Sequence, residues 1–372
     1  MINSEWEELK LFLPEGWEEM AAQTNTLTQL KKDKCPSNYL RLLMLHLACN
    51  LSLREASARA KLSGLMDVSD VAVMKRLQKA ESWLFTMCVA LFKEQGIRPV
   101  QDPSGLNVRL VDASIVKEPG KKGAQWRIHY SLQLSTLMCD SFQLTLTKGK
   151  GTGESFKVHD VKQNDHIIAD RGYSKASDIN YIAEHKAYCT VRVNTSSLLF
   201  QDKKGKAFPL LSKVTSVKRV GSVKSWDVDI TYKENKIPGR LCVIKKSKEA
   251  AQKSQDKAKR EAARKCYKLK PETLEYAKYI ILFTTVPSAL STPEEITEQY
   301  RLRWQIELTF KRFKSITELG SLPKYRADSS RSWIYGKLFV ALLTEKMIRN
   351  AESFSPWGYR VPEVFCQKES MA

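Results

Sequence analysis

The spacing of apolar residues along the chain changes near residue 100. Before that point, apolar positions recur every three or four residues, which is the period of an amphipathic helix. The longest such stretch follows Ser69, a residue type that favours helix N-caps. The expected helices cover residues 39–51, 53–61 and 70–93. We therefore expect a helical domain over residues 1–100.

After residue 100, apolar and polar residues alternate in short runs, as they do in strands that bury one face. Three such runs precede a short apolar strand, a helix and another strand. In chain order we expect these elements at 106–115, 125–134, 142–147, 166–169, 175–186 and 187–193. This order predicts an α/β fold with a ribonuclease H-like core. The pattern resumes with a strand at 279–285 and helices at 293–316 and 332–352, so the core is expected to cover 101–194 and 276–350.

Residues 195–275 interrupt the expected core. They contain strand-like pieces at 222–232 and 240–244, and a Lys-rich stretch at 245–270 that predicts a solvated helix. We therefore expect a basic, β-rich insertion domain over 195–275. Residues 351–372 are expected to form a C-terminal tail.

Charge is spread unevenly along the chain. The 61 Lys and Arg residues exceed the 41 Asp and Glu residues, which gives a formal net charge of +20. Residues 201–270 hold 21 basic and 7 acidic residues, a net charge of +14, whereas residues 1–100 hold 13 and 12. Such an excess favours a polyanionic partner, and nucleic acid is the first to consider. The alternative for the Lys-rich stretch is an exposed, solvated face.

The N-terminal helices allow two interpretations. A turn at Ser63-Gly64 separates two of them, so they could present a helix-turn-helix to a DNA end. The alternative is a helical bundle that makes no contact with a DNA groove, and we take DNA-end binding as the stronger interpretation.

The sequence gives no reason to expect a membrane or an oxidising compartment. No apolar run approaches the roughly 20 residues of a membrane span, and the N-terminal stretch lacks the apolar core of a secretion signal. The eight cysteines are scattered without a CxxC pair, which argues against a zinc ribbon or a disulfide framework. We expect a cytoplasmic protein with no membrane partner, associated with the nucleoid.

Candidate chemistry begins with two aspartates at strand ends. Asp112 follows the run VRLV, and Asp170 follows the run IIA. Either aspartate alone could be a turn or capping residue. Two strand ends of the same local form indicate a shared site, because converging carboxylates hold the divalent cations used in phosphodiester chemistry.

A third carboxylate, Glu307, lies in the helix predicted at 293–316. At about 100° per residue, Tyr300, Arg303, Glu307 and Lys314 share one narrow stripe, with Lys311 beside it. The apolar residues fall on the other side: Leu302, Ile306, Phe310 and Phe313. A carboxylate flanked by cations suits both a metal ion and a scissile phosphate. The alternative is an ordinary surface helix with i,i+4 ion pairs.

These motifs resemble those of a known family. The spacing Tyr300-(2)-Arg303-(3)-Glu307-(6)-Lys314 is similar to the Y-(2)-R-(3)-E-(6)-K signature of the IS4 family of bacterial insertion-sequence transposases. The sequences VDAS and ADRGY, around the two aspartates, resemble the first and second aspartate motifs of that family. The resemblance extends from about residue 50 to about residue 320.

The resemblance implies a DDE transposase with a β-rich insertion between the second Asp and the Glu. Asp112, Asp170 and Glu307 would be catalytic residues that bind two Mg²⁺ ions per active site, with Mn²⁺ as a substitute. The enzyme would cleave DNA at the ends of an insertion sequence by two-metal phosphodiester hydrolysis. It would then join the 3′-OH ends to target DNA, and a hairpin intermediate is left open.

The resemblance also implies contacts with double-stranded DNA, both terminal inverted repeats and target DNA. Tyr300, Arg303 and Lys314 would bind phosphates near the cleaved end. Further candidates for DNA binding in the same motifs are Lys311, Arg171 and Trp304. The protein would act as a homodimer in a synaptic complex. Two other functions are kept: a catalytically silent or domesticated DNA-binding protein, and a ribonuclease H-like nuclease without strand transfer.

Trp226 and Glu154 complete the candidates. Trp226 is the only Trp between residues 195 and 275 and could stack a flipped DNA base. Strand parity places it on the same face as Val228 and Ile230, so packing under the insertion's own sheet is the stronger interpretation. Glu154 resembles an acidic position of the family, but we expect it to have a structural or supporting role.

Overall fold

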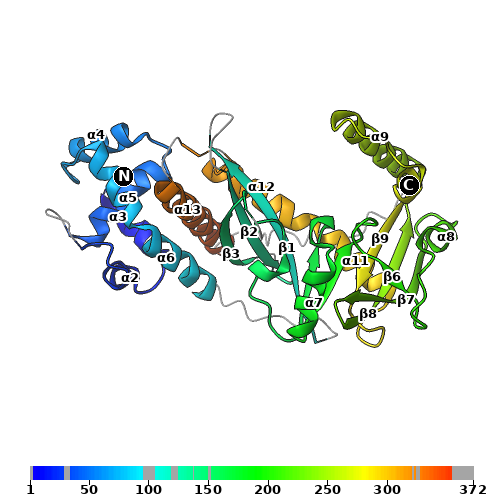
Figure 1. Ribbon diagram of the computed structural model, residues 1–372. Helices are drawn as coiled ribbons and strands as arrows, with labels where there is room; N and C mark the ends of the chain where they lie inside the picture. Colours follow the sequence, from blue (N-terminus) through cyan, green and yellow to red (C-terminus); the bar gives the residue numbers. More distant parts are fainter. Residues whose placement is uncertain are drawn as a thin grey trace. The chain divides into compact units, whose positions relative to one another are not determined.

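The structure is a computed structural model that describes residues 3–28, 34–94, 105–118, 125–136, 138–149, 152–320, 322–323 and 327–353. Contacts divide the chain into two compact units (Figure 1). Unit 1 consists of residues 1–97, 115–126 and 309–372. Unit 2 consists of residues 98–114 and 127–308. Apart from the last residues of one helix, the expected tail at 351–372 lies outside the described residues.

Unit 1 is helical. Its helices are α1 (Asn3–Lys10), α2 (Trp17–Gln23), α3 (Pro36–Leu47), α4 (Leu53–Leu62), α5 (Asp70–Lys79), α6 (Glu81–Glu94), α13 (Ala327–Ser353) and the C-terminal part of α12 (Trp304–Thr317). Ser52 and Glu55 form a capping box that starts α4. An aromatic group fills the centre, where Trp83 stacks on Trp17 with ring centroids 6.3 Å apart. In the sequence, one helix was expected over 70–93, whereas the structure has two, separated at Ala80.

The long C-terminal helix α13 packs against α3, α5 and α6. At Gly336 the backbone of α13 lies so close to the Leu47 side chain of α3 that a Cβ atom would lie 2.5 Å from Leu47 Cδ1. The expected core included residues 276–350, but contacts group residues 309–353 with the N-terminal helices. Apolar periodicity predicts that α13 is buried without indicating which element covers it.

Unit 2 is built around a mixed sheet. In chain order its strands are β1 (Asn107–Lys117), β2 (Gln125–Gln133), β3 (Cys139–Leu146), β4 (Asp165–Ala169), β5 (Tyr188–Arg192), β6 (Phe200–Gln201), β7 (Val223–Tyr232), β8 (Asn235–Lys245) and β9 (Tyr279–Thr284). The nine strands lie in the order β3-β2-β1-β4-β5-β9-β8-β7-β6. β1, β4 and β5 are parallel, and β5, β9, β8 and β7 are antiparallel to their neighbours. This mixed α/β sheet is compatible with a ribonuclease H-like fold.

Helices cover both faces of this sheet. The helical elements of unit 2 are η1 (Phe156–Val158), η2 (Arg171–Tyr173), α7 (Ala176–Glu184), α8 (Leu210–Thr215), α9 (Lys248–Arg264), α10 (Pro271–Tyr276), α11 (Pro293–Leu302) and the start of α12. On one face, Ile179 and Ile182 of α7 pack with the alternate residues Leu241 and Phe283. On the other, α11 packs through Ile296 on the residues in between, such as Cys242 and Leu282.

The strands of the expected insertion extend the core sheet, because β8 pairs with β9. Trp226 of β7 lies opposite Leu241, is half-buried, and packs against the core cluster shared with α7. Among the described residues, no helix combines the length and apolarity needed to cross a membrane.

Candidate active site

The two aspartates lie next to each other at one end of the parallel strands. β1 and β4 pair with Leu110 opposite Ile168. Asp112 and Asp170 each follow these partners by two residues, so they lie on the same face of the sheet in neighbouring strands. Asp170 also caps η2, since the Gly172 amide donates to Asp170 Oδ1 at 2.8 Å.

Glu307 reaches this face from α12. Alternation along the strands puts Asp112 and Asp170 on the face that α11 covers, and α11 leads into α12. One continuous helix was expected over 293–316, but it breaks at Arg303. There the backbone hydrogen bonds change from i→i−4 to i→i−3 spacing. Arg303 keeps αR dihedrals (φ −50°, ψ −30°), so the expected stripe is preserved across the break.

Arg303 joins two of the three carboxylates. Its Nη2 contacts Glu307 Oε1 at 2.5 Å and its Nη1 lies 3.9 Å from Asp112 Oδ2. The guanidinium is largely buried, and it stacks over the ring of Tyr300 at 5.9 Å. The structure therefore brings Asp112, Asp170 and Glu307 to one place, although they are far apart in sequence.

Burial and the charges of neighbouring carboxylates raise the pKa of Asp112 to about 7 from its usual 3.8. Burial has the largest effect, and the charges of Asp170 and Glu307 add to it, while Arg303 opposes it. Like charges held together in a partly buried position are unfavourable unless a cation or a proton compensates them.

Carboxylate oxygens are hard ligands of the kind that Mg²⁺ and Mn²⁺ prefer, so this donor set fits a divalent cation. In the part of the chain that the structure describes, however, no three His, Cys, Asp or Glu side chains are already grouped closely enough to hold a metal ion. Between Asp112 and Glu307 the structure places the Arg303 guanidinium.

Cation binding by the DNA-free protein should weaken as the pH falls through about 7. Below that value Asp112 holds a proton that a cation must displace. The same proton sets the stability of the metal-free protein: because the folded pKa is raised, the contribution of Asp112 to stability declines as pH rises from about 4 to about 7. Titration with Mn²⁺, followed by the electron paramagnetic resonance signal of the free ion, measures the affinity at about pH 6 and about pH 8. Asp112→Asn is the control and should lose the pH dependence; equal wild-type affinities would contradict the expectation.

Arg192 on the next strand lies near two further cations, Arg171 and Lys246, and sequence reasoning identified only Arg171. In the β4–β5 pairing Ala169 lies opposite Val191, so Arg192 lies beside Asp170. Burial lowers the pKa of Lys246 to about 8, and the charges of Arg192 and Arg171 add to this effect. Neither arginine nor Lys246 has a carboxylate within ion-pair distance among the described residues. The parallel register of two predicted strands was the signal that could have identified Arg192.

The remaining candidates for DNA binding in α12 are Trp304, Lys311 and Lys314. Trp304, at the start of α12, is 55% exposed. Lys311 and Lys314 belong to the part of α12 in unit 1, where Lys311 is exposed and Lys314 Nζ donates to the Ile115 carbonyl at 3.3 Å. Burial lowers the pKa of Lys314.

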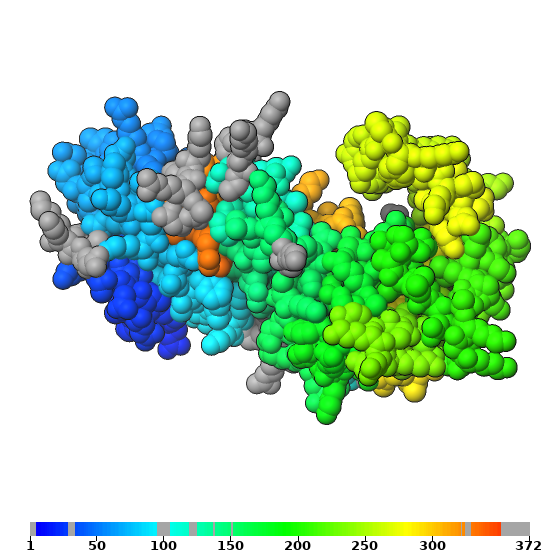
Figure 2. Space-filling view, in the orientation of Figure 1, coloured from blue at the N-terminus to red at the C-terminus, as the bar shows by residue number. Residues whose placement is uncertain are grey.

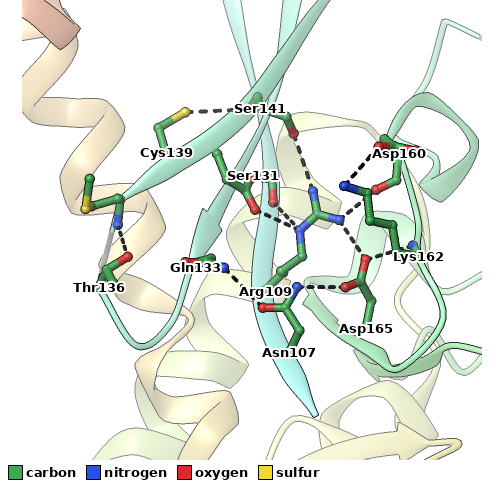
Figure 3. Close-up of polar contacts among 12 residues, drawn as sticks. Asn107, Arg109, Ser131, Gln133, Thr136, Cys139, Ser141, Asp160, Lys162 and Asp165 are labelled. Carbon is green, nitrogen blue, oxygen red and sulfur yellow. Dashed lines mark hydrogen bonds and ion pairs between the residues drawn. The ribbon is translucent and has the colours of Figure 1, made fainter. Parts of the chain in front are cut away.

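A buried ionic network fixes the strands that carry the aspartates (Figure 3). Arg109 of β1 donates through Nη1 to Asp165 Oδ2 at 2.8 Å and through Nε to Asp140 Oδ2 at 2.9 Å. Asp165 opens β4 and also accepts from Asn107 Nδ2 at 2.7 Å. These bonds hold β1 and β4 together five residues before Asp170, on the opposite face of the sheet.

Comparison with known proteins identifies the family. The family described as transposase DDE domain matches residues 103–343. InsL of Escherichia coli (strain K12), named as a transposase for insertion sequence element IS186A, is 31% identical over 350 residues, which cover 92% of this chain and 93% of InsL. The transposase for insertion sequence element IS421 of Escherichia coli is 30% identical over 351 residues, with coverage of 92% and 93%. The transposase for IS231D of Bacillus thuringiensis subsp. finitimus is 21% identical over 263 residues, covering 63% of this chain and 55% of that protein. The chain therefore belongs to the DDE transposases of bacterial insertion sequences, as its resemblance to the IS4 family predicts.

Proposed function

We propose that this DDE transposase cleaves DNA at the ends of its insertion sequence and joins the freed 3′-OH ends to target DNA. The observation that carries the proposal is that Asp112 lies beside Asp170 on neighbouring strands and is joined to Glu307 through Arg303. DDE transposase domains depend on divalent metal; we infer that Asp112, Asp170 and Glu307 would hold two Mg²⁺ ions, or Mn²⁺ as a substitute. The bound cations would supply a deprotonated water and stabilise charge on the phosphate.

The remaining residues of the site would bind and orient DNA. Arg303, Arg171 and Arg192 are cations at the same end of the sheet, so they suit the phosphates on either side of the scissile bond. Tyr300 is held between Arg303 and the apolar cluster under α11, which would fix its hydroxyl near those phosphates. We extend the same role to Lys314 and Lys311, and a stacking role to the exposed Trp304.

Further parts of the chain are proposed to hold the DNA. Residues 1–100 would bind the terminal inverted repeat, and 195–275 would act as a basic insertion domain. Two copies would form a synaptic homodimer. Trp226 stays a candidate for base stacking, although its packing against the core cluster favours a structural role.

Helix α9 holds more Lys and Arg residues than any other element of the proposed insertion. It projects from unit 2 with much of its surface exposed (Figure 2), and it is anchored on α10 by a bond from Gln255 Nε2 to the Leu274 carbonyl at 3.0 Å. Its exposed side chains include Lys253, Lys257 and Arg260. This arrangement suits contact with a DNA backbone.

Replacing Lys253, Lys257 and Arg260 by Gln should flatten the salt dependence of DNA binding. Each lost phosphate contact changes the slope of log K against log salt by about 0.9. Binding to a labelled duplex at several salt concentrations measures the slope. The control replaces Lys162 and Lys186, which precede β4 and β5 at the opposite end of these strands. An unchanged slope in the triple variant would mean that α9 is only a solvated face.

Incubation with a terminal-repeat duplex, Mg²⁺ and supercoiled plasmid tests the proposal. The duplex carries the inverted repeat that we expect to flank the gene. Joined products are expected. Cut products without joining would favour a ribonuclease H-like nuclease, and a shifted band without cutting would favour a DNA-binding protein.

A further inference from the structure

The loop that carries Glu154 is tied down at three points. Arg127 Nη1 of β2 donates to the Thr152 carbonyl, and Lys175 Nζ donates to the Glu154 carbonyl at 2.6 Å. Ser155 Oγ donates to a carboxylate oxygen of α7 at 3.1 Å. Because one tether comes from β2 and two come from α7 and its N-cap, the loop holds the Glu154 side chain in a defined place.

That place is against the turn that carries Asp170. A Cβ atom on Gly172 would lie 1.6 Å from Glu154 Oε2 and 3.2 Å from Asp170 Oδ1. The two carboxylate oxygens are therefore no farther apart than the sum of these distances. Gly172 is also the residue whose amide donates to Asp170 Oδ1. The absence of a side chain at Gly172 is what lets Glu154 approach Asp170.

Tyr173 provides a second, independent observation. Its side chain is fully buried, stacked on Phe156, and its hydroxyl has no hydrogen-bond partner among the described residues. Asp112, Glu154 and Asp170 are its electrostatic neighbours. A buried hydroxyl that lies among three carboxylates and pairs with none of them marks a place where a further group completes the bonding.

We propose that Glu154 is a fourth carboxylate of the active site and shares with Asp170 the divalent cation held there. The proposal rests on the proposed function and adds to it, because sequence reasoning gave Glu154 only a supporting role. The two half-buried carboxylates repel each other. The nearby charges of Arg127 and Lys175 offset part of this repulsion, and a divalent cation bound by both carboxylates would offset the rest. Glu154 approaches from the β3–η1 loop, whereas Glu307 approaches from α12, so they flank the aspartates from different elements.

Metal binding by the DNA-free protein tests this directly. Glu154→Gln keeps the shape of the side chain and should raise the dissociation constant for Mn²⁺ about tenfold without lowering the melting temperature of the metal-free protein. The matched control is Asp160→Asn, which removes an exposed carboxylate from the same segment and should change neither. Wild-type Mn²⁺ affinity in Glu154→Gln would overturn the proposal.

Asp170→Asn separates this proposal from the proposed function. If Asp170→Asn weakens Mn²⁺ binding and Glu154→Gln does not, Glu154 has no part in the site while the proposed function stands. If neither substitution weakens binding, both proposals fail.

A double-mutant cycle tests the contact itself. Gly172 has no positive φ, so Ala is tolerated by the backbone and acts mainly by displacing the Glu154 carboxylate. Gly172→Ala should weaken Mn²⁺ binding in the wild-type background and have little further effect in Glu154→Ala. Additive effects would overturn the inference, because residues that do not share a contact contribute independently.

Discussion

Glu307→Ala should abolish cleavage of the transposon end while leaving end binding nearly unchanged. Glu307 is the carboxylate that α12 brings to the aspartates, and it would stabilise the cations and the charge that develops on the phosphate. Loss of such an interaction costs several kcal/mol at the transition state, which lowers the rate on the order of 10³-fold. Single-turnover cleavage of a labelled end and a mobility-shift titration of the same duplex measure the two quantities.

The substitution should not unfold the protein. The Glu307 side chain is 44% exposed, and its pair with Arg303 is an i,i+4 contact of a kind that adds little to stability. Glu298→Ala is the matched control, since Glu298 forms an exposed pair with Arg301 on α11 at 3.0 Å. The control should cut at the wild-type rate. A Glu307→Ala protein that also cuts at that rate would falsify the catalytic assignment.

Much of this site could be predicted from local patterns. Asp112 and Asp170 each follow a short apolar run, and parallel strands bring such ends together. The position of Glu307 could be predicted from helical periodicity. The break at Arg303 preserves that periodicity, because Arg303 keeps helical dihedrals. The prediction that the opposite side of this helix is buried is also confirmed for Ile306, Phe310 and Phe313. These features depend on period and order alone.

The rest depends on tertiary pairing, which one sequence does not encode locally. Arg192 lies beside Asp170 only because of the β4–β5 register. Glu154 reaches Asp170 through tethers from β2, from α7 and from the N-cap of α7, and each of these bonds joins residues 21 or more positions apart. The partner of α13 is likewise set by close packing at Gly336. The helix break at Arg303 had no Gly or Pro to signal it.

Arg109→Met should destabilise the fold by about 3–5 kcal/mol, because it leaves buried carboxylates without their cation. Asp165 is 1% exposed and Asp140 is largely buried, and both accept from the Arg109 guanidinium. An unpaired buried carboxyl has a raised pKa, so the loss should be smaller at about pH 5 than at about pH 8. Urea unfolding followed by circular dichroism measures the free energy of unfolding at both pH values.

Neutralising Arg109, Asp140 and Asp165 together should separate the effect of this network on stability from its effect on the position of the catalytic aspartates. In Arg109→Met/Asp140→Asn/Asp165→Asn no buried charge is left unpaired, and most of the lost stability should return. This variant still lacks the Arg109–Asp165 bond that joins β1 to β4. Asp112 and Asp170 lie at the ends of these same two strands. A stable triple variant should therefore still bind Mn²⁺ more weakly and cleave more slowly than wild type. If it is as stable and as active as wild type, the ordinary ladder between β1 and β4 is enough to place Asp112 beside Asp170.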